Sequence, residues 1–208
     1  MKHSHTTLYY VHDPMCSWCW GFLPVWKQVQ AALPQTRPVR YVLGGLAPDT
    51  HEPMPESMQR TIKQTWQRIQ QEIPGTQFNY DFWVNCQPRR STYPACRAVL
   101  AAGMQSKVQA KKMLLAIQQA YYLQARNPSD DTVLIAISAE IGLDSSLFEQ
   151  DFYSRQCKTL LTEELQLASA LEAYSFPGLV LRRNESNTMI SIDYTNSDSI
   201  VSEILKHI

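Results

Sequence analysis

No run of apolar residues in this 208-residue sequence approaches the roughly 18–20 residues that a membrane-spanning helix needs. Neither sign of charge is in excess, because 19 Lys and Arg residues balance 19 Asp and Glu residues. The sequence therefore lacks the strongly basic surface that attracts nucleic acid or an anionic membrane. The segment MKHSHTTLYYVHDP at the start also lacks the continuous apolar stretch of a secretory signal. We expect a cytoplasmic protein that binds neither nucleic acid nor a membrane.

Cysteine is scarce as well: the cysteines are Cys16, Cys19, Cys86, Cys96 and Cys157. An odd number at such wide spacings is not typical of a secreted scaffold that disulfides hold together. We interpret the last three as small buried hydrophobic residues. The first two form a Cys-x-x-Cys pair. No second pair of this kind is present to complete a structural zinc site, so we expect no bound metal. A zinc site completed by His3, His5 and His12 is the minor alternative.

The segment Cys16-Ser17-Trp18-Cys19 lies between a predicted strand and a predicted helix. Residues 7–12 (TLYYVH) are β-branched and aromatic, as is typical of a strand, and Asp13-Pro14-Met15 breaks that pattern. Apolar side chains then recur every three or four residues from Phe22 to Leu33, which predicts a helix. A helix N-terminus supplies partial positive charge and free N–H groups to the first sulfur. Because such a thiol ionises easily and the thiolate is reactive, the segment predicts a dithiol–disulfide switch.

Strand patterns occur near both ends of the chain. The strand at 7–12, the helix after it and a second predicted strand at 39–43 indicate a β-α-β unit with parallel strands. Two further predicted strands, 179–181 and 189–192, flank a turn at 184–187, and an amphipathic helix follows them. The ends of the chain therefore predict β-α-β and β-β-α units of one sheet.

Between these units the apolar spacing is helical for roughly a hundred residues. Asp130 and Asp144 have the residue type of helix N-caps, and residues 76–91 have the composition of an extended loop. We expect a discontinuous domain with a helical domain inserted into it: 1–52 and 160–208 for the first, and 53–159 for the insertion.

Two units of this kind around a Cys-x-x-Cys pair are the architecture of the thioredoxin fold. The segment from Asp13 to Phe22 (DPMCSWCWGF) resembles the active-site segment of the DsbA-like superfamily. More narrowly, it resembles the cytoplasmic, FrnE-like branch, whose members are described as predicted protein-disulfide isomerases. The segment Ser175-Phe176-Pro177-Gly178 is similar in position to the cis-proline loop of that superfamily. The resemblance implies an α/β, DsbA-like thioredoxin fold, with a mixed sheet and a large all-helical insertion.

The order of the two cysteines suggests their roles in thiol–disulfide exchange. Cys16 lies nearest the helix end and is expected to be the more exposed sulfur, so we predict that its thiolate attacks a substrate disulfide. Cys19, one turn deeper, resolves the mixed disulfide, while Ser17 and Trp18 tune the Cys16 thiolate. The expected redox group is the Cys16–Cys19 disulfide itself, with no other cofactor. The expected partners are protein or peptide thiols and disulfides, and glutathione is a candidate electron donor.

The resemblance also implies a substrate-binding role for the loop around Pro177. In the superfamily this loop contacts the Cys-x-x-Cys pair, and the residue before the proline offers its backbone to an extended substrate. Here we expect a cis bond before Pro177, with Phe176 as the substrate-binding residue. Phe176 is bulkier than the residues usual at this position, which predicts narrower access for a large substrate.

Other side chains allow a structural or a functional interpretation. Among the aromatic residues near the cysteines, we expect Phe22 and Trp26 in the core and Trp18 at an apolar rim. Arg89-Arg90 could hold an anion such as a glutathione carboxylate, although a solvated loop pair is the simpler interpretation. His12, at the end of the first strand, either modulates Cys16 or has a structural role.

Three classes of function fit the sequence. The leading one is a thiol–disulfide oxidoreductase or protein-disulfide isomerase. The alternative is a glutathione-dependent enzyme like the kappa-class transferases and 2-hydroxychromene-2-carboxylate isomerases, which share the fold and the insertion. Those enzymes typically have serine at the first position of the pair, so two cysteines favour redox chemistry. The third class is a non-catalytic binding protein. In the cytosol, where thiol buffers keep dithiols reduced, we expect reduction or isomerisation of disulfides.

Overall fold

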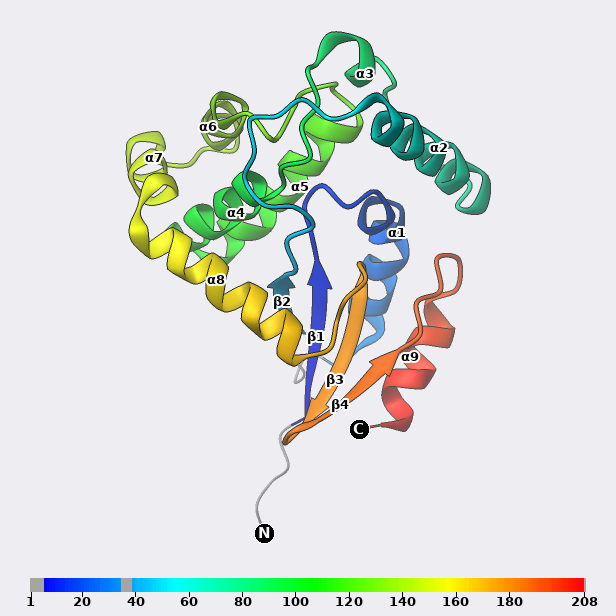
Figure 1. Cartoon of the computed structure of the whole chain (residues 1–208). Coiled ribbons are helices and arrows are strands. Elements are labelled where there is room, and N and C mark those ends of the chain that lie inside the picture. Colours follow the sequence, from blue (N-terminus) through cyan, green and yellow to red (C-terminus); the bar gives the residue numbers. More distant parts are fainter. Residues whose placement is uncertain (1–5, 35–38, 208) are drawn as a thin grey trace. The chain divides into compact units, whose positions relative to one another are not determined.

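The computed structural model describes residues 6–34 and 39–207, so His3 and His5 lie outside the described residues. The chain divides into two compact units (Figure 1). The first comprises Met1–Gly44 and Glu164–Ile208, and the second comprises Gly45–Glu163. The boundaries at 52/53 and 159/160 stay a prediction of where the insertion begins and ends. Within the described ranges, no helix is both long and apolar enough to cross a membrane.

The described residues of the first unit form a four-stranded mixed sheet. Its strands are β1 (Thr6–His12), β2 (Val39–Leu43), β3 (Gly178–Arg183) and β4 (Ser186–Ile190). Their order is β2-β1-β3-β4; β1 and β2 are parallel, and the other pairs are antiparallel. The predicted β-α-β and β-β-α units are therefore both present, and β1 lies in the interior of the sheet.

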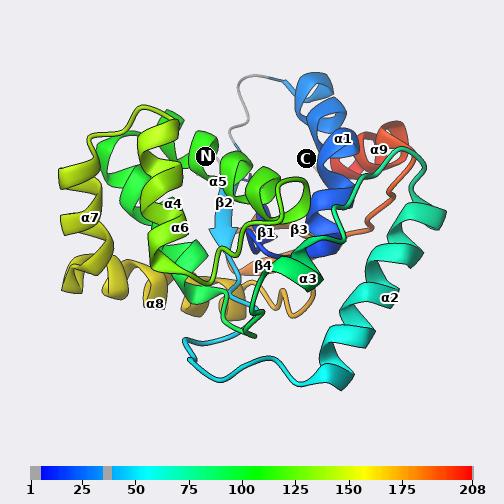
Figure 2. The ribbon, with the colours of Figure 1, turned by 90° about the horizontal axis from the view of Figure 1, so that it is seen from above.

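Side chains of β1 alternate between the two faces of this sheet. Leu8 and Tyr10 face α1 (Ser17–Ala32) and α9 (Ser197–Lys206), which contact each other (Figure 2). Val11 faces the opposite side and packs with Leu171, which follows the end of α8 (Arg155–Ala170). Because strand side chains have a period of two, the same alternation places His12 on the α1 face.

The β3–β4 hairpin is tighter than the sequence predicted. The strands reach Arg183 and Ser186, so only two residues remain for the turn that we expected at 184–187. Asn184 has φ 57°, a left-handed conformation that asparagine tolerates and that short hairpin turns require. The prediction missed this because it treated the whole polar tetrapeptide as a turn.

The second unit is helical. Its helices are α2 (Glu56–Glu72), α3 (Phe82–Asn85), α4 (Tyr93–Gln105), α5 (Lys107–Tyr122), α6 (Asp131–Glu140) and α7 (Ser145–Tyr153), followed by the first residues of α8. The one-turn helix α3 was not predicted, because the segment 76–91 has the composition of a loop. The cap prediction is confirmed for Asp144, whose side chain accepts a hydrogen bond from Leu147 N–H. Asp130 also occupies an N-cap position, but its carboxylate pairs with Arg89 instead of the helix.

An aromatic cluster holds α2, α3 and α5 together. Trp66 of α2 is completely buried and lies 4.8 Å from Phe78, 6.1 Å from Phe82 and 5.7 Å from Tyr122, measured between ring centroids. Such rings bury large apolar areas and gain further from edge-to-face contacts. The rest of α2 is mostly polar, and the helix buries little more than Trp66 and Ile69. The aromatic cluster therefore provides much of the apolar contact that holds α2 in place.

We predict that Trp66→Ala lowers the free energy of unfolding by about 3–5 kcal/mol, because it removes a buried indole and leaves a cavity. Urea unfolding followed by circular dichroism measures this change. The matched control is Val84→Ala at a side chain that is 83% exposed, and its effect should stay within about 0.5 kcal/mol. Equal effects of the two substitutions would contradict a central role of Trp66.

Candidate active site

A tight turn connects β1 to α1 and positions the first cysteine. The buried Asp13 side chain accepts a hydrogen bond from Met15 N–H at 2.7 Å, and its backbone carbonyl accepts one from Cys16 N–H at 3.1 Å. Asp and Asn favour such turns because their short side chains reach the backbone two residues on. Asp13-Pro14-Met15 thus does more than interrupt a strand: it places Cys16 at the start of the helix.

Cys16 is the N-cap of α1. Its Sγ accepts a hydrogen bond from Cys19 N–H at 3.3 Å, where a serine or aspartate oxygen would ordinarily accept it. This is one of the N–H groups that a helix leaves unpaired at its start, and it lies at the positive end of the helix dipole. The sulfur thus occupies the position at which a helix start most readily accepts a hydrogen bond.

The two sulfurs differ in their surroundings, although neither is freely exposed. Cys16 is 5% exposed and Cys19 is 1% exposed, so Cys16 is the more accessible by a small margin. Burial raises the pKa of the Cys19 thiol well above its ordinary value, and the hydrogen bond and charge of Cys16 raise it further. A backbone hydrogen bond from Asp13 acts in the opposite direction. Cys19 therefore holds its proton more firmly than an ordinary thiol does.

The loop before β3 closes the site on the other side. The Phe176–Pro177 peptide bond is cis, which confirms the expectation from the resemblance. The Cys16 thiol donates a hydrogen bond to the carbonyl oxygen of Phe176 at 3.4 Å. Residues 160 positions apart thus meet at one sulfur, and the structure brings together Cys16, Cys19, Phe176 and Pro177 of the predicted site.

The Phe176 ring lies against Gly44, which directly follows β2. A Cβ atom at Gly44 would lie only 2.0 Å from the end of that ring. The ring also packs against the apolar cluster of Val11, Val42 and Val180 on its face of the sheet. The bulk of Phe176 therefore fills space over the sheet, while its carbonyl faces Cys16.

Comparison with known proteins identifies the family to which this site belongs. A family model described as "Thioredoxin" matches residues 9–203. This chain belongs to the thioredoxin family. Among curated relatives, it is 23% identical to the ClpXP adapter protein SpxH of Halalkalibacterium halodurans over 183 residues. The match covers 86% of this chain and 59% of the relative, so the chain spans less than two thirds of that protein's length.

Solved structures show the same fold. A protein from Nitrosomonas europaea, named as a candidate protein disulfide isomerase, is 23% identical with a TM-score of 0.82; the match covers 97% of this chain and 96% of that one. The cytosolic disulfide reductase DsbM from Pseudomonas aeruginosa is 24% identical with a TM-score of 0.74, covering 97% and 98% of the two chains. DsbM has also been solved with GSH. These likenesses confirm the DsbA-like thioredoxin fold with its helical insertion.

An aromatic rim borders the cysteine pair of this thioredoxin-family chain. Trp18 is half-buried and its ring lies 5.0 Å from that of Tyr194, which also contacts the Phe22 ring at 5.8 Å. Phe22 and Trp26 are buried in the core, as predicted. Tyr194 was missed, because a single tyrosine in a polar loop carries no sequence signal for a partner 176 residues away.

The loop that carries Tyr194 is fixed by its own hydrogen bonds. The Asp193 carboxylate accepts N–H bonds from Thr195 and Asn196 and hydroxyl bonds from Thr195 and Ser199. These bonds lower the pKa of Asp193, and the two N–H groups make the largest contribution. Asn196 caps α9 immediately afterwards. The loop is therefore held in one conformation by its own hydrogen bonds.

A hydrogen-bonded stack of aromatic rings lies on the α1 face of β1 and β2. The Tyr10 and His12 rings are parallel with centroids 5.1 Å apart, and Tyr41 contacts both rings edge-on. The Trp26 indole N–H donates to the Tyr41 hydroxyl at 2.8 Å. Burial lowers the pKa of His12 to about 3, so its imidazole is neutral near pH 7.

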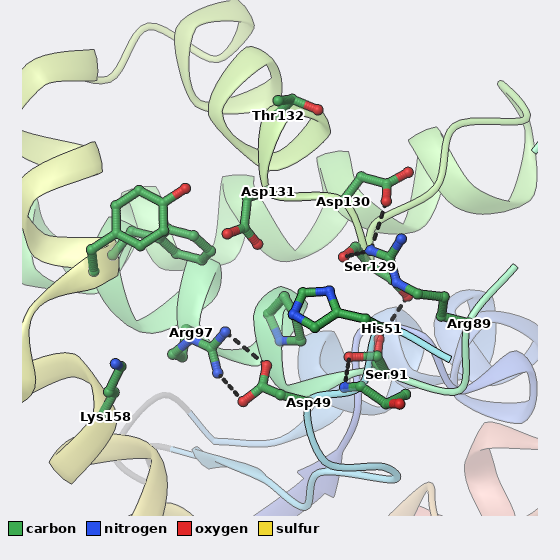
Figure 3. A pocket seen from close by; sticks show the side chains of 14 residues that line it. Asp49, His51, Arg89, Ser91, Arg97, Ser129, Asp130, Asp131, Thr132 and Lys158 are labelled. Atoms are coloured by element: carbon green, nitrogen blue, oxygen red, sulfur yellow. Dashed lines mark hydrogen bonds and ion pairs between the residues drawn. The ribbon is translucent and has the colours of Figure 1, made fainter. Parts of the chain in front are cut away.

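A separate polar pocket lies within the helical unit (Figure 3). Its volume is about 560 Å³, and Arg89 and Arg97 are among the residues that line it. Arg89 contacts Asp130 at 2.6 Å and donates to the backbone carbonyl of Ser129, while Arg97 donates to both oxygens of Asp49 at 2.7 and 2.8 Å. Arg89 is therefore not a solvated loop residue, because Asp130 at the start of α6 pairs with it; anion binding by Arg89-Arg90 stays a prediction.

The other cysteines lie in the helical unit. Cys96 and Cys157 are completely buried, which confirms their interpretation as small core residues, and burial raises the pKa of Cys157 to about 11. Cys86 differs, because it is half-exposed at the end of α3 and its thiol donates to the Ala125 carbonyl at 3.0 Å. Nowhere in the described ranges do three or more His, Cys, Asp or Glu side chains gather as metal ligands would.

We predict that His12 makes the protein acid-sensitive. The unfolded chain binds a proton at this imidazole below about pH 6.5, whereas the folded chain does so only near pH 3. Stability is therefore lost as the pH falls through this window, by at most roughly 1.4 kcal/mol per pH unit. His12→Phe keeps a ring in the stack, so its free energy of unfolding should fall less between about pH 6.5 and pH 4. The control His51→Gln changes an exposed residue, so its free energy of unfolding should depend on pH as that of the parent protein does. The same pH dependence in all three proteins would contradict the prediction.

We predict that Gly44→Ala displaces the Phe176 ring and lowers the free energy of unfolding by about 1–3 kcal/mol. The cost comes from a clash with one side chain, so the double variant Gly44→Ala, Phe176→Ala should lose less than the sum of the two single changes. Urea unfolding of all four proteins measures this coupling. Strictly additive losses would mean that Gly44 and Phe176 do not constrain each other.

Proposed function

We propose that this chain is a thiol–disulfide oxidoreductase that acts on protein or peptide disulfides through Cys16 and Cys19. One observation carries the proposal: the Cys16 sulfur is the N-cap of α1 and lies against the Phe176 carbonyl before a cis-proline. The helix N-terminus favours the thiolate, and the loop offers a backbone acceptor beside it. Membership of the thioredoxin family supports the same chemistry.

The exchange proceeds in two steps. The Cys16 thiolate attacks one sulfur of the substrate disulfide, forming a mixed disulfide and releasing the other substrate sulfur as a thiolate, which takes a proton from water. Cys19 then loses its proton and attacks Cys16, forming the Cys16–Cys19 disulfide and releasing the second substrate thiol. Two electrons pass from the dithiol to the substrate. In isomerisation, a thiol of the substrate itself displaces Cys16, and the dithiol is recovered.

Two surfaces near Cys16 are suited to an extended substrate. The Phe176 carbonyl accepts a hydrogen bond from the thiol, and a substrate N–H can take over that acceptor once Cys16 has reacted. Trp18 and Tyr194 supply apolar contact area at low entropic cost, because aromatic rings have few rotatable bonds. Ser17 and Trp18, within the pair, tune the Cys16 thiolate in this proposal.

The comparisons bear on the partners. DsbM is a cytosolic disulfide reductase that has been solved with GSH, which supports glutathione as the electron donor that regenerates the dithiol here. In this proposal the protein works in a reducing compartment, where thiol buffers hold Cys16 and Cys19 reduced between turnovers. The relatives named SpxH are ClpXP adapters, which favours protein binding as a second candidate function of the rim. The alternative of a glutathione transferase is weakened by the second cysteine.

We predict that Cys16→Ser abolishes reduction of insulin disulfides by glutathione, whereas Cys19→Ser forms a mixed disulfide that accumulates. Turbidity of the released insulin chains measures turnover, and mass spectrometry detects the adduct at Cys16. The matched control is Cys86→Ser, which removes a half-exposed thiol of the helical unit and should leave turnover unchanged. Full turnover without Cys16, or an adduct at Cys86 in its place, would overturn the proposal.

A further inference from the structure

The polar pocket of the helical unit has no role in the proposed exchange. Its volume is about 560 Å³, which lies within the range of roughly 300–1,000 Å³ that is typical of small-molecule sites. Every residue that lines it lies between Asp49 and Lys158, inside the unit Gly45–Glu163. None of the predicted site residues around Cys16 therefore contributes to the pocket, and its ligand has to be inferred from its own side chains.

The pocket is lined by as many positive as negative side chains. Three are cationic and three are anionic: Arg89, Arg97, Lys158, Asp49, Asp130 and Asp131. A phosphate, or any other ligand with charge of one sign, would be attracted by half of these groups and repelled by the other half. A ligand that carries both signs can place each charge beside an opposite one. The charge pattern of the pocket therefore favours a zwitterion.

Two ion pairs already neutralise four of the six charges. Arg97 donates to both oxygens of Asp49 at 2.7 and 2.8 Å, and its guanidinium carbon lies 5.6 Å from the centroid of the Phe152 ring. Arg89 contacts Asp130 at 2.6 Å. A guanidinium that pairs with both oxygens of a carboxylate is held in one orientation. These pairs therefore form fixed walls of the pocket and leave little net charge for a ligand.

Lys158 and Asp131 are the two charges that remain. Among the described residues, neither takes part in an ion pair. Asp131 is the first residue of α6 and Lys158 belongs to α8, so the two charges reach the pocket from different helices. Figure 3 shows the Asp131 side chain pointing into the pocket. One negative and one positive group are thus available to a ligand.

We propose that this pocket binds a zwitterionic amino acid or short peptide, with the ammonium group of the ligand on Asp131 and its carboxylate on Lys158. The carboxylate can also accept from Arg97, because two of its five N–H groups donate to Asp49 and the rest have no acceptor in the described part of the chain. Tyr153, which is 51% exposed, adds an aromatic ring to the lining. The inference goes beyond the proposed function and does not depend on it.

A series of glycine peptides tests which charges the pocket requires. Calorimetric titration of the whole chain uses glycine, triglycine, N-acetyl-triglycine, which lacks the ammonium group, and triglycine amide, which lacks the carboxylate. Inorganic phosphate is the probe for simple anion binding. We expect saturable binding of a zwitterion, and about tenfold weaker binding of each capped peptide, because a hydrogen bond between charged groups is lost. Equal binding of glycine and triglycine assigns the pocket to amino acids, and tighter binding of triglycine assigns it to peptides.

Charge-neutralising variants test the two residues. Asp131→Asn should weaken binding of triglycine or glycine by about tenfold, since Asp131 is half-buried. Lys158→Gln should weaken it by about two- to fivefold, because Lys158 is exposed and water screens its charge. The matched controls are Glu163→Gln and Lys107→Gln, which remove exposed charges outside the pocket and should leave binding unchanged. Circular dichroism verifies the fold of each variant.

Several outcomes would overturn the inference. These are a lack of saturable binding by both glycine and triglycine, equal binding of triglycine and N-acetyl-triglycine, and binding of phosphate without binding of a zwitterion. Equal losses in the pocket variants and in their controls would also contradict it. Cys16→Ser should bind the zwitterion as the parent protein does. A failure of disulfide exchange would therefore leave this inference standing, and a failure of zwitterion binding would leave the proposed exchange untouched.

Discussion

The hydrogen bond from Cys19 N–H to the Cys16 sulfur is the interaction on which the site depends. A helix leaves its first N–H groups unpaired, and here a sulfur takes the place of the usual oxygen cap. The Asp13 turn makes this cap possible, because it places Cys16 directly before α1 in the backbone conformation of an N-cap residue. The same bond therefore starts the helix, fixes the spacing of the two sulfurs and favours negative charge on the first of them.

The rest of the first unit holds this cap in place. β1 lies between β2 and β3, so its end is fixed by strands on both sides. α1 is attached to the sheet by Phe22 and Trp26, which are almost completely buried against Tyr10 and the strands around it. Close-packed cores move little. The start of α1 and the loop before β3 therefore stay close enough for the hydrogen bond between the Cys16 thiol and the Phe176 carbonyl. Gly44 belongs to this frame, since it leaves room for the Phe176 ring.

Local patterns predicted the parts of the site that are close in sequence. The Cys-x-x-Cys pair, the strand before it and the helix after it were predicted from residues 7–33, and most helices of the insertion from their apolar spacing. The family resemblance supplied the cis bond before Pro177. The contacts made by Tyr194 and Gly44 escaped prediction because each depends on a partner more than a hundred residues away. Arg89 was misjudged because its pairing with Asp130 exists only after folding.

The two hydrogen bonds of the Cys16 sulfur impose opposite preferences on its two protonation states. The thiol can donate to the Phe176 carbonyl and accept from Cys19 N–H at once. The thiolate keeps the second bond and strengthens it, but it has no proton for the carbonyl, whose oxygen then faces a negative sulfur. When Cys16 acts as the proposed nucleophile, the Phe176 carbonyl therefore loses the proton that the thiol donated to it. In the proposed function, a substrate N–H that binds this oxygen removes the unfavourable contact, so substrate binding and formation of the nucleophile favour each other.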